Sequence, residues 1–470
     1  MTELVAARDA AVHADMVELR LDGVANPDVA QALRDRRVPV VVTCRPTWEG
    51  GRFEGSEEER RRLLSDAFAF GAEHVDIEWR ANFDDLIRTH ASRAVVSSHD
   101  FAGVPGDLCA RARAMRATGA AVIKVAISAA RLSDTLALLD IAKDGGAVVV
   151  GMGAAGVPSR LLAARFGSLW TYAGAGVAPG QVPAADMVGR FRFRTVGPAT
   201  ALYGVVGDNV MHSFSPAMHN AAFTAARLDA VYVPLRAADF DDFLTFTDAL
   251  GIAGASVTIP FKEDALRISS SADELTRRVG AANTLHRQAD GWRATNTDVD
   301  GFLDSLEAAV EGGGLARARA SVLGAGGAAR AVIVALVSRG AVVTVHARRN
   351  EQARKVAASL GAQVGPWPPA GGSWDLLVNC TPLGSLAEAD ASPLPEGPFD
   401  GHVVYDLTYG RQPSPLIREA QRAGCVTLDG LPMLVAQAER QFEWWIGQRP
   451  PAGAMKAAVA REVMGGDACA

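Results

Sequence analysis

The stretch FRFRTVGPATALYG, residues 191–204, divides this 470-residue chain into two parts with different sequence patterns. Before it, short apolar runs alternate with helical stretches and end in polar or charged side chains. After it, a second series of strands and helices contains a glycine-rich loop. A chain of this length predicts roughly three compact units. We therefore expect one unit before this join and two after it.

The composition is that of an ordinary globular protein, with 49% hydrophobic and 21% charged residues and a net charge of −6. It gives no basic footprint for nucleic acid, no apolar run long enough to span a membrane and no signal-peptide pattern at the start. The five cysteines form no CxxC pair, and the nine histidines show no metal-ligand spacing. The sequence therefore predicts no metal, no disulfide framework and a reducing cytoplasm.

Seven short apolar runs precede the join and are separated by helical stretches. They are MVELRL (16–21), VPVVVTC (38–44), HVDIEW (74–79), AVVSSH (94–99), VIKVAI (122–127), AVVVGM (147–152) and SLWTYA (168–173). Near-continuous apolar strands that alternate with helices indicate a parallel sheet covered on both faces. Seven such repeats predict a (β/α) barrel over residues 1–194.

The first strand of this barrel is missing from the pattern. Only 15 residues precede MVELRL, and a crossover between parallel strands takes at least ~10–12 residues. We therefore expect Thr2–Ala14 to be mostly helical and the chain to supply seven strands. The runs at 16–21 and 168–173 should not be joined through an eighth strand, and we expect the true start to lie upstream.

Polar side chains stand at the ends of these runs, the face where a barrel keeps its active site. Lys124 lies inside the apolar run VIKVAI, where desolvation would lower its pKa and make it a nucleophile towards carbonyls. A structural lysine paired with a carboxylate is the alternative. His99, in SSHDF, is the candidate base, and a core histidine with satisfied hydrogen bonds is its alternative.

These residues resemble type I 3-dehydroquinate dehydratase over nearly the whole first part. The matching motifs, in order, are VELRLD, TCRPTWEGG, VDIEW, SSHDF, IKVA, MGAAGVPSR, FGS and APGQ. The resemblance implies that Lys124 forms a Schiff base with the substrate ketone and that His99 moves the proton, oriented by Glu49. It further implies that Arg160 binds the substrate carboxylate and that hydroxyls and carboxylate are bound by Glu18, Arg20, Arg45 and Gln181. Val177 replaces a hydroxyl residue of the family, so one polar contact is expected to be absent.

After the join, a strand breaks at Ser213–Pro216, where a helix is expected to begin. Its serines either cap the helix or offer hydroxyls to a carboxylate ligand. Lys262 follows a strand and a proline, so it is either a loop-borne acid/base or an exposed surface lysine.

Residues 320–330, ASVLGAGGAAR, read as a strand, the turn Gly324-x-Gly326-x-x-Ala329 and a helix, the context of a dinucleotide phosphate loop. The next strand ends in Arg348 and Arg349. Arginine at this place suits the 2′-phosphate of NADP, whereas NAD would favour an acidic residue. The alternative is a solvated helix start.

Residues 203–459 resemble shikimate dehydrogenase through HSFSPAMHN, SVTIPFK, GAANTL, NTDVDGF, GAGGAAR, NCTPLG, VVYDLTYG and DGLPMLVAQA. The resemblance makes Lys262 and Asp298 the acid/base pair. It assigns substrate binding to Ser213, Ser215, Thr258, Asn283, Tyr409 and Gln437. It assigns NADP binding to Gly324, Gly326, Gly327, Ala328, Arg348, Arg349, Thr381 and Gly430. Ser256 departs from the asparagine of many members.

The whole chain resembles the fused dehydratase–dehydrogenase family, in which one half makes the substrate of the other. We place the barrel at 1–194, the shikimate-binding domain at 200–302 with C-terminal helices at 430–470, and a Rossmann NADP domain at 303–429. One alternative is a dehydrogenase whose dehydratase half is impaired or structural. A second, a metabolite sensor, is disfavoured because the acid/base residues of both halves are present.

Overall fold

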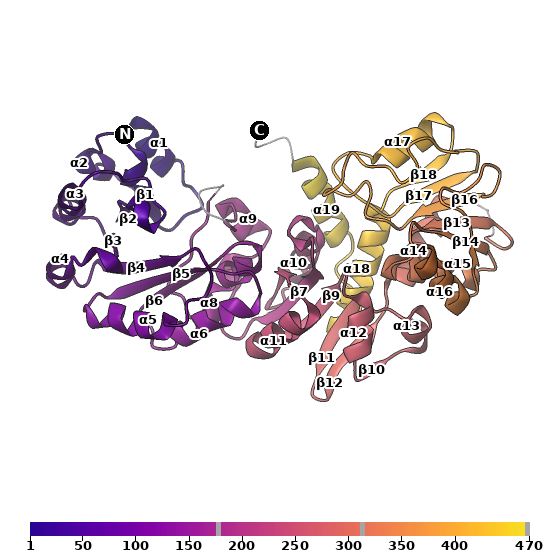
Figure 1. Cartoon of the computed structure of the whole chain (residues 1–470), viewed down its shortest axis with the longest axis horizontal. Coiled ribbons are helices and arrows are strands. Elements are labelled where there is room, and N and C mark those ends of the chain that lie inside the picture. The colour runs from indigo at the N-terminus through magenta and orange to yellow at the C-terminus, as the bar shows by residue number, and fades with distance from the viewer. Residues whose placement is uncertain (175–179, 311–314, 466–470) are drawn as a thin grey trace. The chain divides into compact units, whose positions relative to one another are not determined.

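The computed structural model describes residues 1–174, 180–310 and 315–465, and the chain forms two compact units (Figure 1). The first contains Met1–Thr200 together with Asp241–Leu250, and the second contains Ala201–Phe240 together with Gly251–Ala470. The boundary between Thr200 and Ala201 lies inside the stretch 191–204.

The first unit is built on a parallel sheet of six strands in the order β1-β2-β3-β4-β5-β6. Every described residue of β2 and β6 is buried, as expected for strands covered on both faces. The strands are β1 (Val17–Arg20), β2 (Val40–Thr43), β3 (His74–Glu78), β4 (Ala94–Asp100), β5 (Val122–Ser128) and β6 (Ala147–Met152). The half-barrel architecture and six of the seven predicted strands are confirmed.

The seventh predicted strand, at 168–173, is wrong, because this run does not form a ladder in the described structure. The Leu169 N–H donates to the Ala147 carbonyl at 2.9 Å, but the next bond comes from the Val149 N–H to the Ser168 hydroxyl at 3.0 Å. The hydroxyl therefore takes the place of a backbone carbonyl. Among the described residues β1 pairs only with β2, so the expected lack of a closing strand between the two ends is confirmed.

Helices follow the outer side of this sheet (Figure 1). Helix α1 confirms the predicted helix for Thr2–Asp9, whereas residues 10–14 are not helical. Helix α3 begins with a capping box in which Ser56 and Glu59 bond each other's backbone N–H. The helices are α1 (Thr2–Asp9), α2 (Val29–Leu33), α3 (Glu57–Ala69), α4 (Asp84–Thr89), α5 (Leu108–Ala117), α6 (Leu136–Ala142), α7 (Val157–Leu161), α8 (Ala163–Phe166) and α9 (Ala184–Gly189).

The first unit also includes most of α11 (Phe240–Leu250), which is distant in sequence. The buried Asp242 carboxylate accepts the backbone N–H groups of Leu132 and Ser133 at 2.9 and 2.8 Å. Arg165 donates to the Leu250 carbonyl at 2.8 Å. Both ends of this helix are therefore hydrogen-bonded within the unit.

The second unit contains a mixed sheet in the order β10-β12-β11-β9-β7-β8. Its strands are β7 (Ala201–Gly207), β8 (Ala230–Arg236), β9 (Ile252–Val257), β10 (Ser271–Ala272), β11 (Thr284–Gln288) and β12 (Gly291–Thr295). Its helices are α10 (Ser215–Ala225), α12 (Lys262–Ile268) and α13 (Glu274–Val279).

A second, parallel sheet in this unit has the order β15-β14-β13-β16-β17-β18, the doubly wound order of a Rossmann domain. The predicted Rossmann fold is therefore confirmed. Its strands are β13 (Arg319–Leu323), β14 (Val342–His346), β15 (Gln363–Val364), β16 (Leu376–Asn379), β17 (Val403–Asp406) and β18 (Val426–Leu428). Its helices are α15 (Gly327–Ser338), α16 (Asn350–Leu360) and α17 (Pro415–Arg422).

Three further helices complete the second unit. They are α14 (Asp298–Ala309), α18 (Leu431–Ile446) and α19 (Ala454–Met464). Helix α18 packs against α14 and helix α19 against α10, so the C-terminal helices return to the first part of this unit as predicted. No helix in the described part of the chain is both long and apolar enough to cross a membrane.

Candidate functional site

The first candidate site is centred on Lys124, which β5 buries among carboxylates. Its Nζ lies 2.9 Å from Asp76 Oδ2 and 3.5 Å from Glu18 Oε1. The ring of Tyr172 covers the ammonium at 4.2 Å from the centroid. Parallel register places Lys124 of β5 beside Ser97 of β4, and Asp76 lies on β3, on the other side of β4. The strand-end residues predicted to converge therefore do lie together.

The expected lowering of the Lys124 pKa is wrong. Burial disfavours the ammonium, but the carboxylates of Asp76 and Glu18 outweigh it, so the pKa of Lys124 lies above its ordinary value. The carboxylate pairing considered as the structural alternative is present. Any nucleophilic role consequently requires a base that takes the lysine proton.

The predicted candidate for this base, His99, has a neutral ring in the structure. Burial, with help from the Arg45 and Lys124 charges, holds the pKa of His99 well below 6.5, so the ring is neutral at pH 7. Its Nδ1 lies 3.3 Å from Glu49 Oε1 and 3.0 Å from Arg45 Nη1. A neutral ring nitrogen either donates to the carboxylate or accepts from the guanidinium. Glu49 also accepts the His99 backbone N–H at 2.7 Å, which fixes the residue in place.

A buried charge network frames these residues. Arg45 bonds Asp76 at 3.0 Å and lies 3.2 Å from Glu78, which also pairs with the fully buried Arg60. Glu18 accepts the Thr43 hydroxyl at 2.7 Å. Arg20 forms two bonds of 2.8 Å to Asp22 and, against the opposing effect of burial, its pKa is raised by Asp22 and by the nearby Glu18 carboxylate.

Arg160 is the feature of this site that points to a ligand. It is 2% exposed, forms no ion pair with any described residue, and its Nε has no hydrogen-bond partner among them. Within the described part of the chain its one hydrogen bond is to the Tyr172 carbonyl at 3.4 Å, and burial lowers its pKa to about 10. Because an unpaired buried charge is costly, an anionic group is expected to complete this position.

Two predicted features of the first site are less defined. Gln181 follows the segment 175–179, and its side chain lies against Gly174. Val177 lies outside the described residues, so its predicted missing contact stays a prediction. Tyr172 was not predicted, since no motif distinguishes an aromatic ring that lies over a lysine from one that fills a core.

The second candidate site is centred on Lys262 and Asp298, whose Nζ and Oδ2 are 2.5 Å apart. Asn283 Nδ2 donates to Asp298 Oδ1 at 2.8 Å and to Gln437 Oε1 at 3.3 Å. Four predicted residues from α12, α14, α18 and the end of the 281–283 loop thus meet. The loop assignment of Lys262 is wrong, because it is the first residue of α12.

The remaining predicted substrate residues lie around the start of α10. The Ser213 hydroxyl accepts the Ser215 backbone N–H at 3.2 Å, and the helix begins at Ser215 without a side-chain cap. The ring of Tyr409 lies 5.4 Å from that of Phe214. Thr258 follows β9, where its backbone N–H donates to Val206 at 2.9 Å. The Ser213 hydroxyl therefore does bond the first N–H of the helix, in line with the capping alternative, whereas the Ser215 hydroxyl bonds Tyr232.

The glycine-rich loop has the backbone that a dinucleotide phosphate requires. Gly324 has φ +108, a conformation that disfavours other residues, and a Cβ at Gly326 would meet open space. Helix α15 starts at Gly327 with no side-chain cap, so its first N–H groups, including that of Ala328, remain available to an anion. A Cβ at Gly327 would lie 2.9 Å from Lys262, which brings this loop next to the acid/base pair.

The other predicted cofactor residues surround the loop. Arg348 and Arg349 follow β14, are exposed and form no ion pair within the described residues. Thr381 bonds Asn379 at 2.7 Å and lies beside Gly324. Gly430 directly precedes α18, at a place where a Cβ would collide with the Leu407 carbonyl at 2.2 Å. These residues fit NADP, and two unpaired cations fit its additional phosphate.

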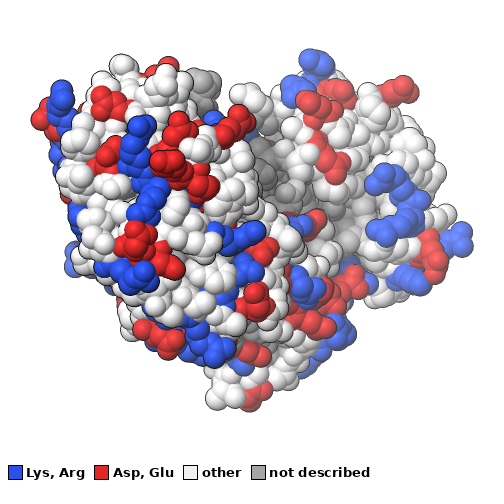
Figure 2. Space-filling model, turned by 60° about the vertical axis from the view of Figure 1, so that its left-hand side comes forward, with Lys and Arg blue, Asp and Glu red and all other residues white. Residues whose placement is uncertain are grey.

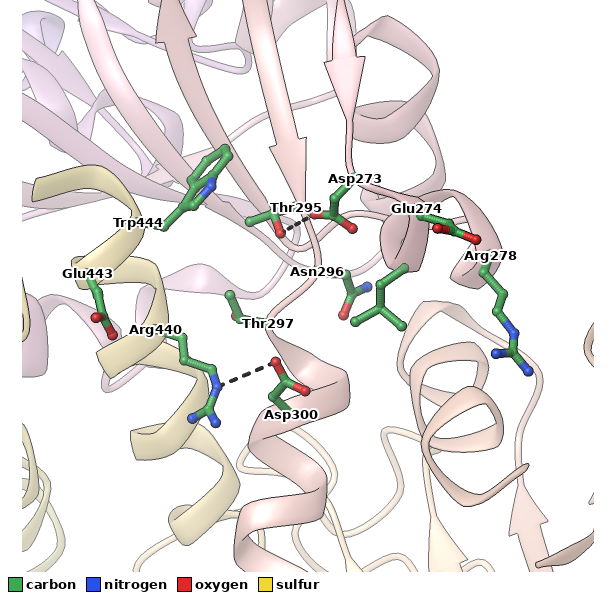
Figure 3. Close-up of a pocket in the computed structure, with 11 residues that line it drawn as sticks. Asp273, Glu274, Arg278, Thr295, Asn296, Thr297, Asp300, Arg440, Glu443 and Trp444 are labelled. Atoms are coloured by element: carbon green, nitrogen blue, oxygen red, sulfur yellow. Dashed lines mark hydrogen bonds and ion pairs between the residues drawn. The ribbon is translucent and has the colours of Figure 1, made fainter. Parts of the chain in front are cut away.

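A pocket of about 880 Å³ lies on another side of the same helices (Figure 3). Asp300 and Arg440, 3.7 Å apart, project into it from α14 and α18, together with Trp444. None of the predicted site residues lines this pocket among the described residues. Asn296 and Thr297 line the pocket and also bond residues of the second site, Asp298 and Asn283 respectively.

Comparison with known proteins agrees with both sites. The type I 3-dehydroquinase family model matches residues 2–198, the shikimate dehydrogenase substrate-binding domain matches 205–285, and the shikimate 5′-dehydrogenase C-terminal domain matches 430–460. A chloroplastic bifunctional 3-dehydroquinate dehydratase/shikimate dehydrogenase from Arabidopsis thaliana is 32% identical over 93% of this chain and 78% of its own length. The NADP(+) shikimate dehydrogenase of Methanocella arvoryzae is 40% identical over 54% of this chain and 96% of its own.

Solved structures resemble the second part of the chain. Shikimate dehydrogenase from Aquifex aeolicus is 33% identical with a TM-score of 0.51, over 55% of this chain and 97% of that one. Shikimate 5-dehydrogenase from Thermus thermophilus, solved with NADP(H) and shikimate, is 34% identical with a TM-score of 0.51, over 56% of this chain and 99% of that one. With the full-length relative and the family models of both halves, these matches show that the chain belongs to the bifunctional 3-dehydroquinate dehydratase/shikimate dehydrogenase family.

Proposed function

We propose that this chain catalyses two successive reactions: dehydration of 3-dehydroquinate to 3-dehydroshikimate in the first unit, and reduction of 3-dehydroshikimate to shikimate with NADPH in the second. The observation that carries the proposal is that each unit holds its own lysine–aspartate pair, Lys124 with Asp76 at 2.9 Å and Lys262 with Asp298 at 2.5 Å. The charges on the face in view in Figure 2 are interspersed, in keeping with small-molecule substrates.

In the dehydratase, Lys124 gives its proton to His99, which is neutral and close enough for the lysine charge to lower its pKa. The free amine attacks the ketone carbon, His99 returns its proton to the resulting hydroxyl, which leaves as water, and an iminium forms with His99 neutral again. His99 then takes a proton from the adjacent carbon, and the electron pair moves into the iminium. Return of that pair expels the hydroxyl as water with the proton from His99, and hydrolysis frees product and lysine.

Binding in this site falls to the surrounding polar residues. Arg160 holds the substrate carboxylate, since its buried guanidinium has no carboxylate partner among the described residues. Glu49 orients His99, and hydroxyls or carboxylate are bound by Glu18, Arg20, Arg45 and Gln181.

In the dehydrogenase, the chemistry that NADPH would supply when bound is a hydride for the carbonyl carbon. Lys262 and Asp298 hold and deliver one proton at the carbonyl oxygen. The hydroxyls of Ser213 and Ser215, with Tyr409, receive the carboxylate, whereas Thr258, Asn283 and Gln437 hold the ring. Phosphates are bound by the 324–328 loop, Thr381 and Gly430, and the 2′-phosphate by Arg348 and Arg349.

Borohydride trapping tests the covalent step directly. Reduction in the presence of 3-dehydroquinate should add the substrate mass to the peptide that carries Lys124. Lys143, exposed in the same unit and paired with Asp140, is the internal control and should stay unlabelled. Label on another lysine, or none while dehydration proceeds, would exclude the Schiff base. With NADPH added, shikimate should accumulate from 3-dehydroquinate.

A dehydrogenase with an impaired dehydratase half is the second candidate, and one observation favours it. Strand β1 has a single ladder partner among the described residues, so the sheet does not close into a barrel there. Normal dehydrogenase activity with a dehydration rate near background would select this candidate.

The domain limits and the compartment belong to the same proposal. We retain a dehydratase domain at 1–194, a shikimate-binding domain at 200–302 with 430–470, and an NADP domain at 303–429. The four described cysteines are free thiols, which supports the cytoplasm as the compartment. The Arabidopsis relative is chloroplastic.

A further inference from the structure

The dehydrogenase assignment leaves two parts of its own motifs without a role: His219 and Asn220 in HSFSPAMHN, and Ser256 in the place of an asparagine. All three residues contact the buried Tyr232. We propose that Tyr232 is a positioning residue of the dehydrogenase. Its hydroxyl holds Ser256, and Ser256 holds Gln441. Gln441 in turn holds Asn283 and, through it, Asp298. This inference rests on the proposed dehydrogenase function.

A continuous line of hydrogen bonds joins these residues inside the second unit. The Tyr232 hydroxyl donates to Ser256 Oγ at 2.6 Å, and Ser256 donates to Gln441 Oε1 at 2.7 Å. Gln441 Nε2 donates to the Asn283 carbonyl at 3.2 Å. Asn283 Nδ2 then donates to Asp298 Oδ1 at 2.8 Å. Tyr232, Ser256, Gln441 and Asn283 are 0%, 6%, 1% and 2% exposed, so water does not compete for these bonds.

The donor and acceptor groups of these residues fix the direction in which each hydrogen bond is donated. The Asn283 carbonyl can only accept, so Gln441 must present its NH₂ group there and its oxygen to Ser256. Ser256 then uses its single proton on Gln441 and must accept from Tyr232. Tyr232 is therefore the terminal donor, and burial keeps it protonated by raising its pKa, against the opposing effect of its hydrogen bonds with Ser256 and Ser215.

The contact with Ser215 extends the line across the substrate site. Ser215 lies at the serine pair proposed to receive the carboxylate, whereas Asn283 and Asp298 lie at the reacting end. One phenol thus connects the two ends, so a shift of its hydroxyl changes their spacing.

The unused motif residues hold this phenol. Asn220 donates to the Tyr232 carbonyl at 2.8 Å and accepts the Tyr232 N–H at 2.8 Å, which fixes the backbone. The ring of His219 stacks on that of Tyr232 at 4.4 Å and 13°. Burial lowers the pKa of His219 to about 3, so the stacked ring is neutral. A tyrosine clamped at both backbone and ring is suited to hold a fixed donor.

Tyr232→Phe is the test, because it removes only the hydroxyl. Loss of one buried hydrogen bond predicts a rise of about 3- to 10-fold in the KM for shikimate. The KM for NADP should stay within about twofold. Tyr405→Phe is the matched control: Tyr405 is equally buried and its hydroxyl bonds Ser305 at 2.5 Å, outside the line. It should leave the KM for shikimate unchanged.

A double variant tests the route. If Tyr232 acts through Ser256, then Tyr232→Phe combined with Ser256→Ala should be no worse than Ser256→Ala alone. Additive effects, an unchanged KM in Tyr232→Phe, or an equal rise for NADP would each overturn the inference.

A readout without turnover separates this inference from the proposed function. The side-chain amide NMR signals of Gln441 and Asn283 should shift in Tyr232→Phe and not in Tyr405→Phe. Unmoved signals would overturn the inference even in an active enzyme. If the signals shift in Tyr232→Phe but the wild-type protein does not oxidise shikimate, the hydrogen-bonded line is supported and the proposed function is rejected.

Discussion

At the scale of single residues, Arg160 differs from the other buried arginines of its unit. Arg60 pairs with Glu57 and Glu78, whereas Arg160 has no carboxylate among the described residues. Arg160→Gln should therefore raise the KM for 3-dehydroquinate by roughly 10- to 150-fold, the effect of losing a charge-assisted bond of about 1.5–3 kcal/mol. The melting temperature should not fall, because an unpaired buried charge is removed with the side chain.

Arg60→Gln is the control for this prediction. It leaves Glu78 with Arg45 alone and should lower the melting temperature, as expected when one partner of a buried pair is lost. An unchanged KM in Arg160→Gln, or equal destabilisation in both variants, would contradict the proposed carboxylate site.

The neutral state of His99 predicts how the dehydratase activity depends on pH. Only the neutral ring acts as a base, and its pKa is held well below 6.5 by burial and by the charges of Arg45 and Lys124. The dehydratase kcat/KM should therefore stay level from pH 8 down past 6.5 and fall only at lower pH. Since the unfolded ring binds a proton near 6.5 and the folded one does not, stability also declines as pH falls below 6.5. An acid limb centred at or above 6.5 would contradict this assignment.

At the scale of elements, the end of β14 and the start of α15 form the expected phosphate site. Replacing both Arg348 and Arg349 by alanine should raise the KM for NADP about 10- to 150-fold, because one charge-assisted phosphate bond contributes roughly 1.5–3 kcal/mol. The KM for NAD should change little. Arg354→Ala, an exposed arginine of the neighbouring α16, is the control and should affect neither. Equal effects on both cofactors would exclude a 2′-phosphate contact.

Elements with a strong local signal were predictable from the sequence. The strand–turn–helix around Gly324 and the buried strands β2 to β6 follow from glycine placement and unbroken apolar runs. The run 168–173 has the same apolar pattern but no ladder, because the Ser168 hydroxyl substitutes for a backbone acceptor. Lys262 was expected in a loop because it follows a proline, yet α12 starts there. The error at 168–173 arises from a single contact that no periodicity records.

At the scale of the whole molecule, motifs predicted which residues meet, but not their charge states. Lys124 and His99 were found from their place in the strands, whereas the pKa of Lys124 depends on Asp76 and Glu18, which reach it across the sheet. Gln441 was missed although it stands four residues after Gln437, on the same face of one helix. The spacing would have been sufficient to find it.

The separation of the two lysine sites into different units predicts that each activity can be removed alone. Lys124→Met should abolish dehydration and preserve shikimate oxidation, and Lys262→Met should do the reverse, because the sites share no predicted residue. Methionine keeps the aliphatic volume, and the melting temperature of each variant verifies folding. A mixture of the two variants should convert 3-dehydroquinate and NADPH to shikimate, since the intermediate can diffuse from one protein to the other. Loss of both activities in either folded variant, or an inactive mixture of two variants that each retain one activity, would show that the sites depend on each other.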